Sequence, residues 1–220
     1  MKLRVLLPRL CLLPLILALG ACATNRSYIA LDVPSRGVAA DSGKVAVIQS
    51  VSVVRNFEVD PDDPSTPSLK KGDKYSLDAD GRKAAVARKR NGYGMAIGDI
   101  MLQPPQTIET ITRDLVADGL RSRGYRVVPA DGDVPADALR VNVRVKEFWA
   151  WLTPGFWAID MEARLKTLLQ FGQGDRTIEV AAYGKKTAPT GREDNWKQAY
   201  DRAFQDYLEK QQTTFEQSGL

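Results

Sequence analysis

Residues 138–146 read Ala-Leu-Arg-Val-Asn-Val-Arg-Val-Lys, and this stretch carries the clearest β-strand signal in the chain. Its apolar positions fall at every second residue: Leu139, Val141, Val143 and Val145. That spacing is typical of a strand with one buried and one solvated face. Residues 157–169 alternate in the same way, and Thr153-Pro154-Gly155 lies between the two stretches. The sequence therefore predicts an antiparallel hairpin.

Periodic segments on both sides of this hairpin predict an α+β fold. β-branched residues fill 44–54, and strand patterns recur at 125–128 and 176–183. Apolar residues at helical spacing cover 107–124 and 193–215. Because helices and strands are not regularly interleaved, we expect a mainly antiparallel sheet of about five strands, with two helices packed on one face.

Glu147 interrupts the alternation of the hairpin. Continuing the pattern from Val145 would place the Glu147 carboxylate on the apolar face, where an unpaired charge is costly. A β-bulge removes the conflict by shifting the phase of the strand. We favour this interpretation over a buried functional acid.

The first residues have the three zones of a bacterial secretory signal. Basic residues come first, an apolar run covers 10–19, and Leu19-Gly20-Ala21-Cys22 resembles a lipobox, the motif that directs cleavage before a lipid-modified cysteine. The apolar run is about half as long as a membrane-spanning helix requires. The sequence predicts a cleaved signal peptide at 1–21, a lipidated Cys22 and a flexible tether over 22–43. The alternative is an ordinary cleaved signal that happens to contain a cysteine.

The lipobox also predicts the compartment. Ala23 follows Cys22 in place of the aspartate that usually retains lipoproteins at the inner membrane. We therefore expect attachment to the outer membrane, facing the periplasm, with one domain over 44–216.

Composition excludes several classes of site. The chain has no histidine, and its two cysteines are Cys11, in the predicted signal, and Cys22. The folded part would thus have no disulfide and no cysteine or histidine metal site. Removing the signal's Lys2, Arg4 and Arg9 lowers the formal net charge from +4 to +1. A net charge of +1 does not favour nucleic-acid binding. We also expect no cofactor.

Residues 56–80 are rich in Asp, Pro and Lys, which predicts a surface insertion in the domain. Asp60, Asp62 and Asp63 lie close together in it. The glycine and the distal glutamate of a calcium loop are missing at the required offsets, so we expect no metal site.

A basic cluster follows the insertion and consists of Arg82, Lys83, Arg88, Lys89 and Arg90. These cations are candidates for contact with anionic lipid headgroups. The alternative is the solvated edge of a strand.

Aromatic residues surround the predicted hairpin turn, and the candidates for partner or membrane contact are Trp149, Trp151, Phe156 and Trp157. If they face solvent, they form a binding surface, because such side chains favour sites that are part apolar and part wet. If the final helix covers them, they are ordinary core.

Asp160 and Glu162 share one face of the second hairpin strand. Paired carboxylates can perform acid–base hydrolysis. Cross-strand ion pairs with Arg140, Arg144 and Lys146 explain them better, so we expect no catalytic residues.

A resemblance to the YajG-like family of bacterial lipoproteins is carried by the leader with its lipobox, the strand at Val45–Val54, the segment Ala84-Ala85-Val86-Ala87-Arg88, the stretch Asp114–Val127 and the hairpin after it. The resemblance covers most of the mature chain to about Leu169. It implies an outer-membrane lipoprotein without known catalysis, and no active-site residues transfer from it.

These observations predict a non-enzymatic lipoprotein that is held to the membrane by its lipid and binds or scaffolds another envelope component, most simply a protein. An alternative is an accessory role in lipid or lipopolysaccharide transport, which needs an apolar groove beside residues 82–90. A carboxylate hydrolase is the third hypothesis.

Replacing the lipidation residue tests the anchor directly. Cys22→Ser removes the thiol that accepts the lipid, so unprocessed and unlipidated precursor should accumulate. Membrane fractionation and mass spectrometry of the amino terminus measure both effects. Normal processing and lipidation of the variant would refute the predicted anchor.

Overall fold

The stretch at 138–146 begins the longest strand of the structure, β8 (Leu139–Pro154). It pairs antiparallel with β9 (Ile159–Phe171), and β9 pairs antiparallel with β10 (Arg176–Ala188). The predicted hairpin is therefore confirmed. The third strand is five residues longer than the segment predicted from the sequence, which ended at Tyr183.

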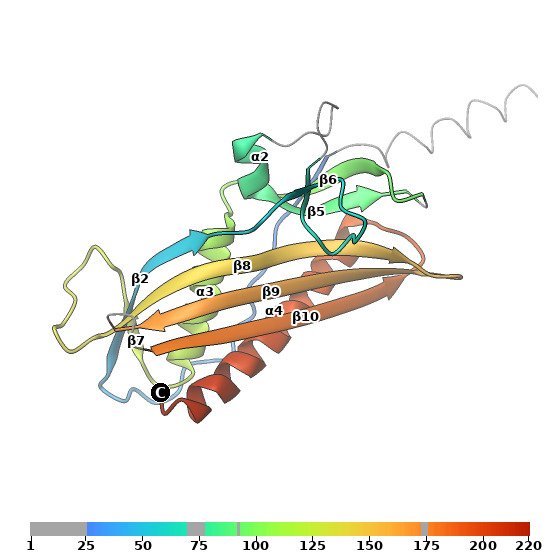
Figure 1. Ribbon diagram of the computed structural model, residues 1–220. Helices are drawn as coiled ribbons and strands as arrows, with labels where there is room; N and C mark the ends of the chain where they lie inside the picture. Colours follow the sequence, from blue (N-terminus) through green and yellow to red (C-terminus); the bar gives the residue numbers. More distant parts are fainter. Residues whose placement is uncertain (1–25, 70–77, 92, 173–175) are drawn as a thin grey trace, which may run out of the picture.

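The computed structural model describes residues 26–69, 78–91, 93–172 and 176–220. Cys22, the predicted signal peptide at 1–21 and part of the insertion lie outside the described residues. Over the described residues the chain is α+β, with a mixed sheet and helices α3 (Ile108–Arg121) and α4 (Glu193–Gln217) against one face of it (Figure 1). A short helix, α2 (Ala79–Ala84), lies near the top of the molecule in the same view.

The expectation of a mainly antiparallel sheet is wrong. β2 (Val45–Val53) runs parallel to β8 and to β7 (Arg126–Val128), and β5 (Ala85–Arg90) also runs parallel to β8. Only strands joined by short turns pair antiparallel here. β2 is separated from β8 by the insertion and α3, and this long connection returns the chain to the same end of the sheet.

Several of the described strands lie outside the five predicted from the sequence. β6 (Ala96–Leu102) pairs antiparallel with β5, and β1 (Ser27–Ile29) adds to it in parallel. The described sheet thus reads β1-β6-β5-β8-β2-β7, with β9 and β10 continuing from the other edge of β8. Within the insertion, β3 (Glu58–Val59) and β4 (Ser68–Leu69) form a separate small pair.

The segment over residues 26–43 packs along the domain, so the predicted flexible tether is wrong for this part of it. Ile29 and Leu31 are buried in the core. The amide of Leu31 donates to Gln106 Oε1 at 2.9 Å, and the amide of Ser42 donates to the carbonyl of Gly124 at 3.0 Å. Small and polar composition does not reveal such backbone contacts.

The core lies between the sheet and the two long helices. Thr107 caps α3 and exchanges hydrogen bonds with Thr110 in a capping box. Aromatic residues of α4, including Tyr200 and Phe204, are buried against the sheet, and Phe148 of β8 stacks on Tyr200 with ring centroids 5.2 Å apart. The aromatic stripe of the final helix is therefore core.

The predicted bulge is confirmed. The register between β8 and β9 shifts between Val145 and Glu147, so one extra residue of β8 faces its partner. After the shift, Phe148 and Ala150 point into the core, while Trp149 and Trp151 occupy the other face.

Arg55 fills the fork where β2 leaves β8 and β5 joins it. Its guanidinium donates to the carbonyl oxygens of Ala85 and Phe148, both at 2.8 Å, and to that of Arg82 at 2.6 Å. Burial lowers the pKa of Arg55 to about 10. The three hydrogen bonds of this side chain satisfy backbone carbonyl groups that pair with no neighbouring strand.

Gly184 lets α4 lie directly on β10, which yields a test of the packing. A Cβ atom there would approach the Ala199 carbonyl oxygen to 2.2 Å and the Ala203 nitrogen to 2.3 Å. Gly184→Ala should therefore lower the free energy of unfolding by at least about 2 kcal/mol in a denaturant titration. Gly132→Ala is the matched control, because the Cβ atom that alanine adds there lies 3.7 Å from its nearest neighbour and the change should stay within about 0.5 kcal/mol. Equal stability of the two variants would contradict the close packing.

Candidate functional site

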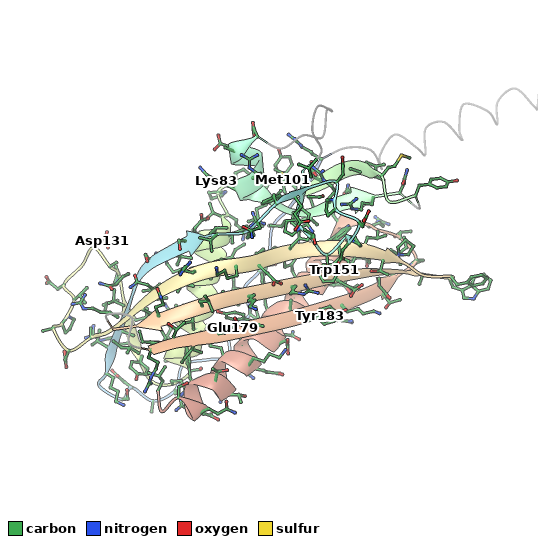
Figure 2. The ribbon with its side chains drawn as sticks, in the orientation of Figure 1. Lys83, Met101, Asp131, Trp151, Glu179 and Tyr183 are labelled. Atoms are coloured by element: carbon green, nitrogen blue, oxygen red, sulfur yellow. The ribbon has the colours of Figure 1, made fainter. Side chains whose placement is uncertain are left out.

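The outer face is the surface of β8, β9 and β10 that points away from α3 and α4. Trp151, Glu179 and Tyr183 lie on it, one from β8 and two from β10 (Figure 2). Because strand residues alternate between faces, each strand supplies every second side chain to it. Neither of the long helices covers this face.

The insertion covers part of the outer face. Trp149 and Trp151 are only 2% and 6% exposed. The Phe57 ring packs edge-on against Trp149 with centroids 5.8 Å apart, and Trp149 Nε1 donates to the Pro64 carbonyl oxygen at 3.4 Å. These two tryptophans are therefore core, but the bulge turns them to the face opposite the final helix, where they cluster with Ala85 and Met101, and the insertion covers Trp149.

A groove of about 430 Å³, called here the outer groove, lies beside this cover. One wall is the insertion and the floor is the sheet. Its lining includes Lys146, Glu147, Trp149, Arg164, Lys166, Leu168 and Glu179.

Charged side chains of neighbouring strands form ion pairs in the outer groove. Arg164 Nη1 lies 3.6 Å from Glu147 Oε2, and Lys166 Nζ lies 3.1 Å from Glu179 Oε1. Arg164 also stacks its guanidinium over Trp151, 5.0 Å from the ring centroid. All four charged groups are partly exposed, so the pairs are weak and open to exchange with an incoming ligand.

Asp160 and Glu162 lie on the outer face, but their partners differ from the expected ones. Asp160 Oδ2 is 2.6 Å from Lys185 Nζ, and Glu162 accepts hydrogen bonds from Thr153 and Tyr183. The hairpin register explains the error, because the expected Arg144 stands opposite Leu168, far along the strand from both carboxylates.

These contacts shift two pKa values. The hydrogen bond from Lys185 lowers the pKa of Asp160, with a second contribution from Thr187. Burial, followed by the hydrogen bond to Glu162, raises the pKa of Tyr183 to about 12. Asp160 therefore stays ionised and Tyr183 stays protonated near neutral pH, which suits a stable polar network.

The basic cluster does not form one lipid-facing surface. Arg88 and Lys89 are 3% and 8% exposed. Arg88 Nε donates to Asp99 Oδ1 at 2.9 Å, and Lys89 Nζ donates to the Ser27 hydroxyl at 2.6 Å. Their burial is possible because the unpredicted strands β1 and β6 bring these partners.

The remaining members of the basic cluster are dispersed. Arg82 and Lys83 belong to α2, where Lys83 lies 3.5 Å from Asp80 and points outward (Figure 2). Arg90 ends β5 and donates to the Gly94 carbonyl at 2.8 Å. The five cations therefore serve different local contacts.

Phe156 and Trp157 form the hairpin tip, between β8 and β9. They are 89% and 88% exposed, and their rings meet edge-on with centroids 4.6 Å apart. Of the four aromatic residues predicted as a contact surface, these two are solvent-facing. The sequence grouped all four because they are close in the chain, but only the outer two extend beyond the insertion.

The β5–β6 turn adds two residues that the sequence analysis missed. Tyr93 and Met95 are exposed, and they line a cleft of about 510 Å³ together with Leu152 and Pro154, next to the hairpin tip. Asn91 Oδ1 holds this turn by accepting from the amides of both residues at 3.0 Å. The Asn91-Gly92 dipeptide was an available turn signal between two strands.

Two further findings concern the described residues only. No three carboxylates among them gather closely enough to hold a metal ion. Of the helices in these parts of the chain, none has the length and apolar character needed to cross a bilayer.

Comparisons with known proteins show no family. No protein-family model matches the chain, and no curated protein matches it. An uncharacterised protein of known structure has a TM-score of 0.41 at 13% identity, over 89% of this chain and 99% of its own. A Xanthomonas campestris protein of family DUF330 has a TM-score of 0.44 at 11% identity, over 88% of this chain and 98% of its own.

A third structure, a Helicobacter pylori homolog of neuraminyllactose-binding hemagglutinin, has a TM-score of 0.38 at 9% identity, over 87% of this chain and 100% of its own. Similarities of this size carry no argument about function. The resemblance to the YajG-like family stays a prediction.

The insertion's hold on Trp149 can be tested by shortening Phe57. Phe57→Ala removes the edge-on ring contact and admits water, so the free energy of unfolding should fall by about 2 kcal/mol. Tryptophan emission should shift to longer wavelength. Phe156→Ala deletes an exposed ring and should change stability by less than about 0.5 kcal/mol. An unchanged emission spectrum in Phe57→Ala would contradict the covering role of the insertion.

Proposed function

We propose that this chain is a non-enzymatic lipoprotein, anchored through Cys22 to the outer membrane and facing the periplasm, whose domain binds another envelope component in the outer groove. The lipobox supports the anchor. The observation that carries the binding role is the outer groove itself, a cavity on a sheet face that neither long helix covers. Such a face is available to a partner while the other face supplies the core.

The chemistry of the outer groove indicates what it would bind. Leu168 offers apolar surface at the floor, and Lys146, Arg164 and Lys166 stand around it. Carboxylates of a ligand can replace Glu147 and Glu179 as partners of the two paired cations, because exposed ion pairs are held weakly. The groove therefore suits a protein segment that presents an apolar side chain flanked by acidic residues.

Site-specific cross-linking in intact cells tests this proposal. A photo-reactive amino acid at Leu168 should yield a discrete cross-linked product with an envelope protein. The same group at Lys210, an exposed position on α4 away from the groove, is the matched control and should yield none. Membrane fractionation confirms that each variant is anchored.

Charge reversal sharpens the result. Arg164→Glu with Lys166→Glu should abolish the product at Leu168, because the groove would then repel acidic segments, whereas Lys210→Glu should leave it unchanged. An anchored chain that gives no product at Leu168, or a product that survives the double reversal, would count against the outer groove as the binding site.

A further inference from the structure

Several exposed apolar residues, most of them aromatic, gather at one end of the sheet because of strand direction. β5 and β8 run parallel, so the β5–β6 turn and the hairpin tip project at the same end, as Figure 1 shows. Tyr93 and Met95 come from the first, and Phe156 and Trp157 from the second. We call these four residues the aromatic end.

Folding does not explain the aromatic end. Large apolar side chains contribute to stability when they are buried, yet Phe156 and Trp157 are almost fully exposed and pack chiefly on one another. Trp and Tyr favour surroundings that are half apolar and half polar, as at the headgroup level of a bilayer. The composition of this end therefore fits a lipid surface.

The described residues begin on the same side of the sheet. β1 runs parallel to β6, and β6 begins at the β5–β6 turn, so the chain enters β1 from that side. Arg26 lies next to Asp99, with Nε 3.5 Å from Oδ2. Cys22 precedes Arg26 by four residues, which can span at most about 14 Å.

The distance between β1 and β8 across the sheet is also short. β1 and β8 are three strand spacings apart in the sheet, or about 14 Å. Along the strands, Ser27 is level with Ala150 through Ile100 and Ala87, so Phe156 lies six residues, or about 20 Å, further toward the tip. The five residues from Cys22 to Ser27 can extend at most about 18 Å, which brings a lipid on Cys22 close to the level of the hairpin tip.

We infer that the aromatic end is a second, non-covalent contact with the bilayer that carries the lipid anchor, with Phe156 and Trp157 seated at the headgroup level. This inference rests on the proposed anchor at Cys22. Two contacts with the membrane fix the orientation of the domain, which a lipid alone leaves free. The strands of the outer face then lead away from the membrane, and the outer groove opens sideways into the periplasm.

Lipid-specific quenching of tryptophan tests the inference. The lipidated full chain is reconstituted in vesicles of phosphatidylethanolamine and phosphatidylglycerol, with and without brominated acyl chains, and flotation confirms that it is bound. Brominated lipid should quench part of the emission. Trp157→Phe should float equally and lose that quenching, because the other tryptophans are buried in the domain. Trp151→Phe is the control and should retain it.

The outcomes separate the anchor from the contact. A chain that fails to float refutes the anchor and the membrane contact with it. A chain that floats without quenching by brominated lipid leaves the anchor standing and overturns the contact. Protection of Trp157 from aqueous iodide without lipid quenching would assign the aromatic end to a protein or a second copy of the chain, which also overturns it.

Discussion

The single extra residue in β8 between Val145 and Glu147 determines how the rest of the molecule is arranged. Side chains of a strand alternate strictly, so one inserted residue exchanges the two faces for everything that follows. Before the bulge, Val145 points into the core. After it, Phe148 takes that role against the helices, and Trp149 is turned to the outer face. The insertion is consequently required, because a tryptophan on an open sheet face would otherwise remain in water.

The same region explains why β8 can serve two neighbours along one edge. A bulge bends and twists the strand, so β2 follows its first half and β5 meets it further along. The fork between them leaves backbone carbonyls without strand partners. Arg55 occupies the fork with hydrogen bonds to carbonyls of α2, β5 and β8, which offsets the cost of burying its charge. Because Arg55 closely follows β2, it also fixes where the insertion begins.

The sequence predicted the elements whose signal is local and missed those whose partners are distant. Alternation identified the hairpin, and the misfit of Glu147 identified the bulge. The pattern of a strand shows which residues share a face, but not which strand lies beside it, so the parallel neighbours of β8 were missed. Arg88 illustrates the consequence for sites: its charge predicted exposure, whereas Asp99 on an unpredicted strand makes its burial possible. The partners of Asp160 were wrong for the same reason, since register is set across strands.

The four tryptophans differ in where the fold places them and in how far it buries them. Trp196 of α4 is buried in the main core, Trp149 and Trp151 are buried on the other face of the sheet with Ala85 and Met101, and Trp157 is exposed at the hairpin tip. The first three contribute to folding through the surface that they remove from water. Trp157 gains nothing of this kind from the fold, and an exposed aromatic pair favours association. The fold therefore keeps the tryptophans that contribute to stability apart from the one that is exposed for contact. Strand direction places this exposed tryptophan at the end of the sheet from which the chain enters β1.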